Sequence, residues 1–191
     1  MSTPYEPQAV VEATGRWLES AVIGLNLCPF AGLPWRKGQV RMRVSDAASP
    51  AQLAEHLAEE VLALQLAEPV ERETTLLIHP HVLTDFLEYN DFLDLADGVL
   101  DALGLDGIIQ VASFHPEYRF ADCPADDPAH CTNRSPYPML HLLREASIEA
   151  ATARLAEPEA IYERNIQTLR ELGFSGWHQL MNSKGVSPVR S

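Results

Sequence analysis

Two histidine-proline pairs follow two short apolar segments, and they are the first candidates for chemistry. His79-Pro80 ends the run from Thr74 to Ile78, and His115-Pro116 ends the run from Ile108 to Phe114. Imidazole titrates near neutral pH, so each histidine suits a general acid, a general base or a metal ligand. Proline keeps the preceding residue in extended backbone, so we expect each histidine to leave the end of a strand. Hydrogen bonding to loop carbonyls is the structural alternative for each.

The chain from His115 to Ser135 is long, polar and interrupted by proline, and it is rich in aromatic, arginine and histidine residues. A loop of this length inside a small domain is usually functional or disordered, and this composition favours function. We predict that a helix begins at Pro136 with Ser135 as its cap. The first N–H groups of a helix lack internal partners and attract anions. The predicted pocket for a carboxylate or phosphate comprises Arg119, Asn133, Arg134, Ser135 and Tyr137. Ordinary capping beside a surface arginine is the alternative.

Cys28 is the third candidate for catalysis, with His115 and His79. It precedes Pro29 at the end of a predicted helix, and that end does not lower a thiol pKa through the helix dipole. We therefore leave two roles open for Cys28, a nucleophile activated by a nearby base or a buried wall of the pocket.

Metal and cofactor binding have weaker support. His115, Cys123, His130 and Cys131 are suitable ligand types for zinc, but their spacing matches no compact zinc motif. No glycine-rich nucleotide loop follows a predicted strand, so no cofactor is implied. His81 and His141 are weaker candidates, because His141 falls within the helix predicted after Pro136.

The composition excludes several classes of protein. The chain has 191 residues, a formal net charge of −13 and a pI near 4.8. General affinity for nucleic acid needs many Lys and Arg residues to neutralise phosphates, so we expect no nucleic acid partner. No apolar run approaches the ~20 residues that cross a bilayer, and no secretory signal is visible. Three cysteines suit a cytoplasmic protein better than a disulfide framework. The composition does not indicate the oligomeric state.

Alternating strand and helix patterns predict an α/β fold. We expect a small, mainly parallel sheet of three or four strands flanked by helices, in one layered domain over residues 1–181 with a flexible tail over 182–191. The predicted strands span 39–44, 74–78 and 108–114, the first at an edge, and a hairpin in the long loop is a possible fourth. The predicted helices begin after Pro7, after the caps Ser49, Thr84 and Ser135, and at Pro158. The first three end at Pro29, Pro69 and Gly104, and the last ends at Gly173. In parallel sheets ligands sit beyond the carboxyl ends of the strands, where both histidine-proline pairs lie.

Three motifs are characteristic of one family. They are Gly24-Leu25-Asn26-Leu27-Cys28-Pro29-Phe30-Ala31, Phe114-His115-Pro116-Glu117-Tyr118-Arg119-Phe120, and the stretch from Thr132 to Glu145, TNRSPYPMLHLLRE. The chain resembles, nearly throughout up to about Gly173, the bacterial family called domain of unknown function 1415. The resemblance implies no activity. In the family pattern the position of Cys131 is usually aromatic, which weakens the zinc hypothesis. The shared motifs gather residue types suited to a small polar pocket: Cys28, His115, Asn133, Arg134 and Tyr137.

Three functions remain open at this point, and whether the protein is an enzyme is uncertain. The first is an enzyme acting on a small anionic molecule, a carboxylate or phosphate, in a His/Arg/Cys pocket. The second is a non-catalytic metabolite-binding or regulatory module that uses the same pocket. The third is a metal-dependent hydrolase that uses His79 and His115. The position of His115 discriminates between them, because a catalytic imidazole should reach a reactive group across an open cleft.

Overall fold

A computed structural model describes residues 5–153 and 160–182. The helices are α1 (Pro7–Trp17), the π-helix η1 (Leu18–Ile23), α2 (Gly32–Arg36), α3 (Pro50–Leu66), α4 (Phe86–Ala102), the 3₁₀ helix η2 (Pro128–Asn133), α5 (Glu145–Thr152) and α6 (Ala160–Asn182). The strands are β1 (Val40–Val44), β2 (Thr74–Ile78), β3 (Ile109–Phe114) and β4 (Met139–Arg144). The predicted α/β class is confirmed.

The four strands form one mixed sheet in the order β1-β2-β4-β3. Strand β1 pairs with β2 in parallel, whereas β4 lies between β2 and β3 and runs antiparallel to both. The prediction of a mainly parallel sheet is therefore wrong. The three predicted strands nevertheless point the same way, so their carboxyl ends lie at one edge of the sheet. The predicted edge position of β1 is confirmed.

The helix predicted after Ser135 is wrong, because the chain from Met139 to Arg144 is a central strand. A central strand buried on both faces carries a nearly continuous apolar run, and such a run cannot be distinguished from a buried helix by periodicity alone. Pairing on both sides with β2 and β3 satisfies its backbone groups and decides between the two. The fourth strand thus follows the long loop and does not arise from a hairpin within it.

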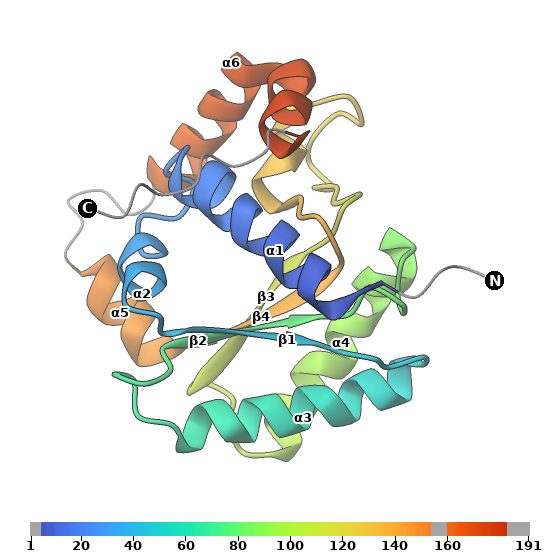
Figure 1. Cartoon of the computed structure of the whole chain (residues 1–191), viewed down its shortest axis with the longest axis vertical. Helices are drawn as coiled ribbons and strands as arrows, with labels where there is room; N and C mark the ends of the chain where they lie inside the picture. The colour runs from blue at the N-terminus through green and yellow to red at the C-terminus, as the bar shows by residue number, and fades with distance from the viewer. Residues whose placement is uncertain (1–4, 154–159, 183–191) are drawn as a thin grey trace.

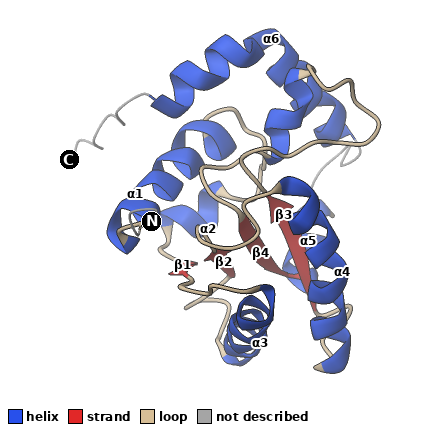
Figure 2. Ribbon diagram, turned by 90° about the vertical axis from the view of Figure 1, so that its right-hand side faces the viewer, coloured by secondary structure: helices blue, strands red, loops and turns tan. Residues whose placement is uncertain are grey.

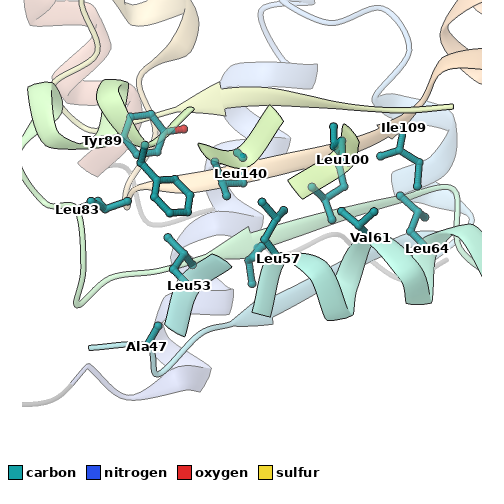
Figure 3. Packing of buried hydrophobic residues seen from close by; sticks show 14 of the residues in the cluster. Ala47, Leu53, Leu57, Val61, Leu64, Leu83, Tyr89, Leu100, Ile109 and Leu140 are labelled. Atoms are coloured by element: carbon teal, nitrogen blue, oxygen red, sulfur yellow. The ribbon is translucent and has the colours of Figure 1, made fainter. Parts of the chain in front are cut away.

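Helices cover both faces of the sheet (Figure 1). Helices α3 and α4 cover one, which we call the α3/α4 face, and α1 covers the other, with α6 farther out, which we call the α1/α6 face. Figure 3 shows the core beneath the α3/α4 face, where Leu53 and Leu57 of α3 meet Leu140 of β4. The second core contains Trp17 of α1 and Leu169 of α6. The sheet therefore separates two apolar clusters.

Local sequence signals account for the helix ends. Ser49 caps α3 by accepting a hydrogen bond from the backbone N–H of Gln52. The cap of α4 is Asp85 and not the predicted Thr84, because the Asp85 carboxylate accepts from the N–H groups of Leu87 and Glu88 at 2.9 and 3.1 Å. The segment expected to be a loop after Pro29 contains the short helix α2.

Helix α6 follows the segment that contains Pro158, which lies outside the described residues. The helix breaks at Gly173, as predicted, but continues beyond it to Asn182. The rest of the expected tail, 183–191, also lies outside the described residues. Arg170 of α6 pairs with Asp127 at 2.7 Å and so holds the long loop, yellow in Figure 1 and tan in Figure 2, against α6.

Across the described ranges, no helix is long and apolar enough to span a membrane.

Candidate functional site

His79 and His115 leave the sheet at the same edge, as predicted. Their strands are not neighbours, however, because β4 separates β2 from β3. Two strand spacings correspond to about 10 Å, which leaves room for one side chain between the two histidines. That side chain is the aromatic ring of Tyr89 from α4. Its centroid lies 5.7 Å from the ring of His79 and 5.1 Å from the ring of His115.

His79 is fully buried on the α3/α4 face. Its Nδ1 lies 2.9 Å from the carbonyl oxygen of Val82, so Nδ1 carries the proton and donates it. Its Nε2 is buried and has no hydrogen-bond partner within the described part of the chain. Burial lowers the pKa of His79 to about 4, against the opposing effect of the Val82 carbonyl. The imidazole is therefore neutral at neutral pH.

His115 is also buried, and both of its ring nitrogens are engaged. The N–H of Glu117 donates to Nδ1 at 3.0 Å, so the proton lies on Nε2, which donates to the carbonyl of Leu83 at 3.3 Å. Burial lowers the pKa of His115, although the carbonyl groups of Leu83 and Thr84 and the charges of Glu117 and Asp85 oppose that effect. This imidazole does not face an open cleft.

The two histidines together hold the turn that leads into α4. Val82 and Leu83 supply the carbonyl groups that accept from the imidazoles. Leu83 has φ 55°, in the left-handed region that a leucine rarely adopts, and its side chain is buried. The α4 cap, Asp85, follows two residues later. The geometry thus assigns both histidines a structural contact, the alternative that the sequence left open.

A hollow of about 380 Å³ lies next to this turn, and we call it the α4 hollow. Its lining comes from the start of α4 and from the chain after β3: Asp85, Phe86, Leu87, Asn90, Glu117, Arg119, Phe120 and Ala121. The Phe86 ring lies between the hollow and His115, with 5.5 Å between the two ring centroids. Arg119 is the predicted substrate-binding residue that reaches this hollow. Its exposed guanidinium forms no hydrogen bond or ion pair with the residues that the structure describes.

The other predicted binding residues lie elsewhere. Arg134 donates from Nε to the carbonyl of Tyr118 at 3.3 Å, and its guanidinium carbon lies 5.4 Å from the ring centroid of Phe174 in α6. The Asn133 amide donates to the carbonyl of Ser113 at 3.1 Å. Because no helix begins at Pro136, the predicted anion site at a helix entrance loses its physical basis.

Ser135 and Tyr137 lie in the turn that precedes β4. The Ser135 hydroxyl donates to the carbonyl of Tyr137 at 2.7 Å, so it closes this turn and caps no helix. The Tyr137 ring packs edge-on against Tyr5, with 5.3 Å between the ring centroids. Burial raises the pKa of the Tyr137 phenol. Both side chains therefore serve the packing of this turn.

Cys28 lies on the opposite face of the sheet from His115, and the Arg134 guanidinium is turned toward α6. Arg134 packs on α6 and Cys28 packs against the core of the α1/α6 face, whereas the ring of His115 contacts Phe86 and Tyr89 of α4. Burial raises the pKa of the Cys28 thiol, with the N–H groups of the following turn opposing it. The structure therefore does not bring the three predicted catalytic residues around one space.

The hypothetical zinc ligands do not gather around one point in the described part of the chain. His130 accepts from the N–H of Phe120 at 3.1 Å and donates to the carbonyl of Pro124 at 2.8 Å, so both nitrogens hold the long loop. Burial raises the pKa of Cys131 to about 11, which opposes formation of the thiolate. Over residues 5–153 and 160–182, no three His, Cys, Asp or Glu side chains lie so that they could hold a metal ion.

His141 is a polar residue whose position the sequence analysis missed. It lies in β4 on the α1/α6 face, half-buried, and its Nε2 is 2.7 Å from the Thr74 hydroxyl, which itself donates to the carbonyl of Leu142. Burial lowers its pKa to about 4, so the imidazole is neutral at neutral pH. The alternation of Met139, His141 and Leu143 would have indicated one strand face, had the segment been read with period two.

Comparison with known proteins places the chain in a family. The model of the family described as "Protein of unknown function (DUF1415)" matches residues 9–179. No curated protein and no solved structure matches the chain. The matched range includes the α4 hollow, both histidine-proline pairs and Cys28. With nearly all of its length covered by that one model, the chain belongs to the DUF1415 family.

Proposed function

We propose that this protein binds a small molecule carrying a carboxylate or phosphate group in the α4 hollow. The observation that carries the proposal is the free guanidinium of Arg119 in the lining of that hollow. A guanidinium without a protein partner can offer a two-pronged contact to a carboxylate or phosphate. The amide of Asn90 provides a further donor, and Phe86 and Phe120 supply apolar wall.

The chemistry of the lining favours binding over catalysis. The lining has no His, Cys, Ser, Thr, Lys or Tyr, and its two carboxylates, Asp85 and Glu117, are exposed, with Asp85 engaged in capping α4. His115 lies behind Phe86, and both of its nitrogens are engaged. A catalytic role for His115 would require two hydrogen bonds to break and Phe86 to move. The non-catalytic module is therefore the better supported of the alternatives.

A thermal-shift screen with phosphate, citrate and small monocarboxylates tests this proposal. A ligand at 100 times its dissociation constant stabilises the folded state by about 2.7 kcal/mol, a shift of several degrees for a chain of this size. We expect the shift in the wild type and its loss in Arg119→Gln. Lys37→Gln removes one positive charge from an exposed position beyond α2 and should keep the full shift.

Arg134→Ala separates this hollow from the site first predicted from the sequence. The ligand-induced shift should survive in Arg134→Ala, even if the variant is less stable without ligand. Loss of the shift in Arg134→Ala, together with its retention in Arg119→Gln, would overturn the proposal. A turnover of the bound molecule that disappears in a folded His115→Asn variant would instead support the enzyme hypothesis.

A further inference from the structure

The α4 hollow is lined by charges of both signs. Arg119 supplies one positive charge, and Asp85 and Glu117 supply two negative charges. None of the three appears in an ion pair among the described residues, although all three border the same space. Opposite charges that share a hollow without neutralising one another leave room for a ligand group between them.

The two carboxylates gather on the side of the hollow that adjoins His115. The N–H of Glu117 donates to Nδ1 of His115 at 3.0 Å, and Asp85 directly precedes Phe86, whose ring lies 5.5 Å from that imidazole. Asp85 uses Oδ1 to cap α4, and its second oxygen makes no hydrogen bond within the described chain. Glu117 is exposed and unpaired in the same part of the structure. Acceptors for a positively charged group are therefore available beside the guanidinium.

We infer that the ligand of the α4 hollow is a small zwitterion of the amino-acid type. Its carboxylate would meet Arg119, its ammonium group would meet Asp85 and Glu117, and an apolar side chain would contact Phe86 and Phe120. A purely anionic molecule would meet Arg119 alone and leave both carboxylates without a partner, so we expect it to bind more weakly than a zwitterion. The volume of about 380 Å³ is near the lower end for ligand sites and suits a molecule of this size. This inference rests on the proposed function and specifies its ligand class.

Three probes that differ only in their charged groups test the inference by calorimetric titration. L-phenylalanine carries both groups, 3-phenylpropanoate lacks the ammonium group, and 2-phenylethylamine lacks the carboxylate. We expect L-phenylalanine to bind about tenfold more tightly than either analogue, since a hydrogen bond to a charged group contributes about 1.5–3 kcal/mol. Citrate and phosphate complete the series.

Charge-removing variants assign the two ends of the ligand. Asp85→Asn keeps the cap of α4, because Asn caps a helix as well as Asp does, and it removes only the charge. Asp85→Asn and Glu117→Gln should each reduce the preference for L-phenylalanine over 3-phenylpropanoate, whereas Arg119→Gln should abolish binding of both. Asp94→Asn, on the same helix but outside the lining, is the matched control and should behave as the wild type.

The possible outcomes separate this inference from the proposed function. If 3-phenylpropanoate, citrate or phosphate binds through Arg119 at least as tightly as L-phenylalanine, the zwitterion is wrong and the anion site stands. If 2-phenylethylamine alone binds, and Arg119→Gln has no effect, both are overturned. Absence of binding by every probe also overturns both.

Discussion

Nε2 of His115 lies 3.3 Å from the carbonyl oxygen of Leu83, a buried leucine with φ 55°. A left-handed backbone costs a non-glycine residue on the order of 1–3 kcal/mol and persists only where its surroundings hold it. The hydrogen bonds from His115 and His79 supply part of that hold, and Asp85 and Phe86 follow directly in the lining of the α4 hollow. The shape of this hollow therefore depends on two neutral imidazoles.

The stability of the protein should depend on the protonation of His79. The pKa of His79 is about 4 in the folded chain and near 6.5 when exposed, so below pH 6.5 the unfolded chain binds a proton that the folded chain does not. The free energy of unfolding should then fall as the pH drops from about 6.5 to about 4. His79 alone should contribute about 2.5 kcal/mol between pH 7 and pH 4.5.

Urea denaturation of the wild type and of His79→Asn at these two pH values measures this contribution. Asn retains an N–H donor for the Val82 carbonyl but does not titrate. The variant should lose less stability on acidification than the wild type, whatever its stability at pH 7. An equal loss in both proteins would show that His79 is not the titrating group.

Removing the hydroxyl of Tyr89 should destabilise the fold. This hydroxyl donates to the carbonyl of Met139 at 2.8 Å and accepts from the N–H of Phe114 at 3.0 Å, so it joins the ends of β4 and β3. Tyr89→Phe leaves the buried carbonyl and the Phe114 N–H without that partner, which should cost about 2–3 kcal/mol by urea denaturation. Tyr162→Phe, at a half-exposed ring, should stay within about 0.5 kcal/mol of the wild type. A similar small effect in both variants would argue against the bridge.

The sequence located most elements of this fold but not the pairing that makes its sheet. Short-range signals sufficed where caps and prolines are local, as for α3 after Ser49. The run from Met139 to Leu143 was assigned to a helix because a doubly buried strand has no alternation of polar and apolar residues. Its state is decided by β2 and β3, which are 61 and 25 residues away when counted from Ile78 and Phe114 to Met139. A period-two reading of Met139, His141 and Leu143 is compatible with a strand, but only the pairing with β2 and β3 makes that state preferred.

Interpreting the segment from Met139 to Arg144 as part of a helix also affected which site residues could be predicted. His79 and His115 were correctly expected at one edge of the sheet, because proline fixes how each strand ends. The anion site predicted around Arg134 depends on a helix that does not form, whereas Arg119, of the same predicted pocket, lines the hollow. The contacts that bury both imidazoles come from Tyr89 and Phe86, on a helix whose position over the sheet is a tertiary feature. The sequence thus indicated the correct edge without revealing that its histidines are covered.

Neutralising Glu60 should weaken the attachment of the edge strand. The side chain of Glu60 is only 3% exposed and accepts two hydrogen bonds from Arg41 of β1 and one from Arg43. Burial raises the pKa of this carboxyl, but the arginines outweigh it and hold the pKa below its ordinary value. Glu60→Gln should reduce the free energy of unfolding by about 2 kcal/mol, less than for a fully buried pair because the arginines are partly exposed. Glu59→Gln, whose side chain is 60% exposed, should change it by less than about 0.5 kcal/mol.

Two glycines should respond to alanine in opposite directions. Gly98 lies inside α4, and an added Cβ would meet nothing within 4 Å, so Gly98→Ala should stabilise the protein by about 0.5–1 kcal/mol. Gly173 also has open space around it, but its φ of 66° and ψ of 170° belong to a region that only glycine adopts readily. Gly173→Ala should therefore cost about 1–3 kcal/mol through backbone strain alone. Urea denaturation of both variants gives the comparison, and an unchanged stability of Gly173→Ala would mean that α6 can straighten through its break without cost.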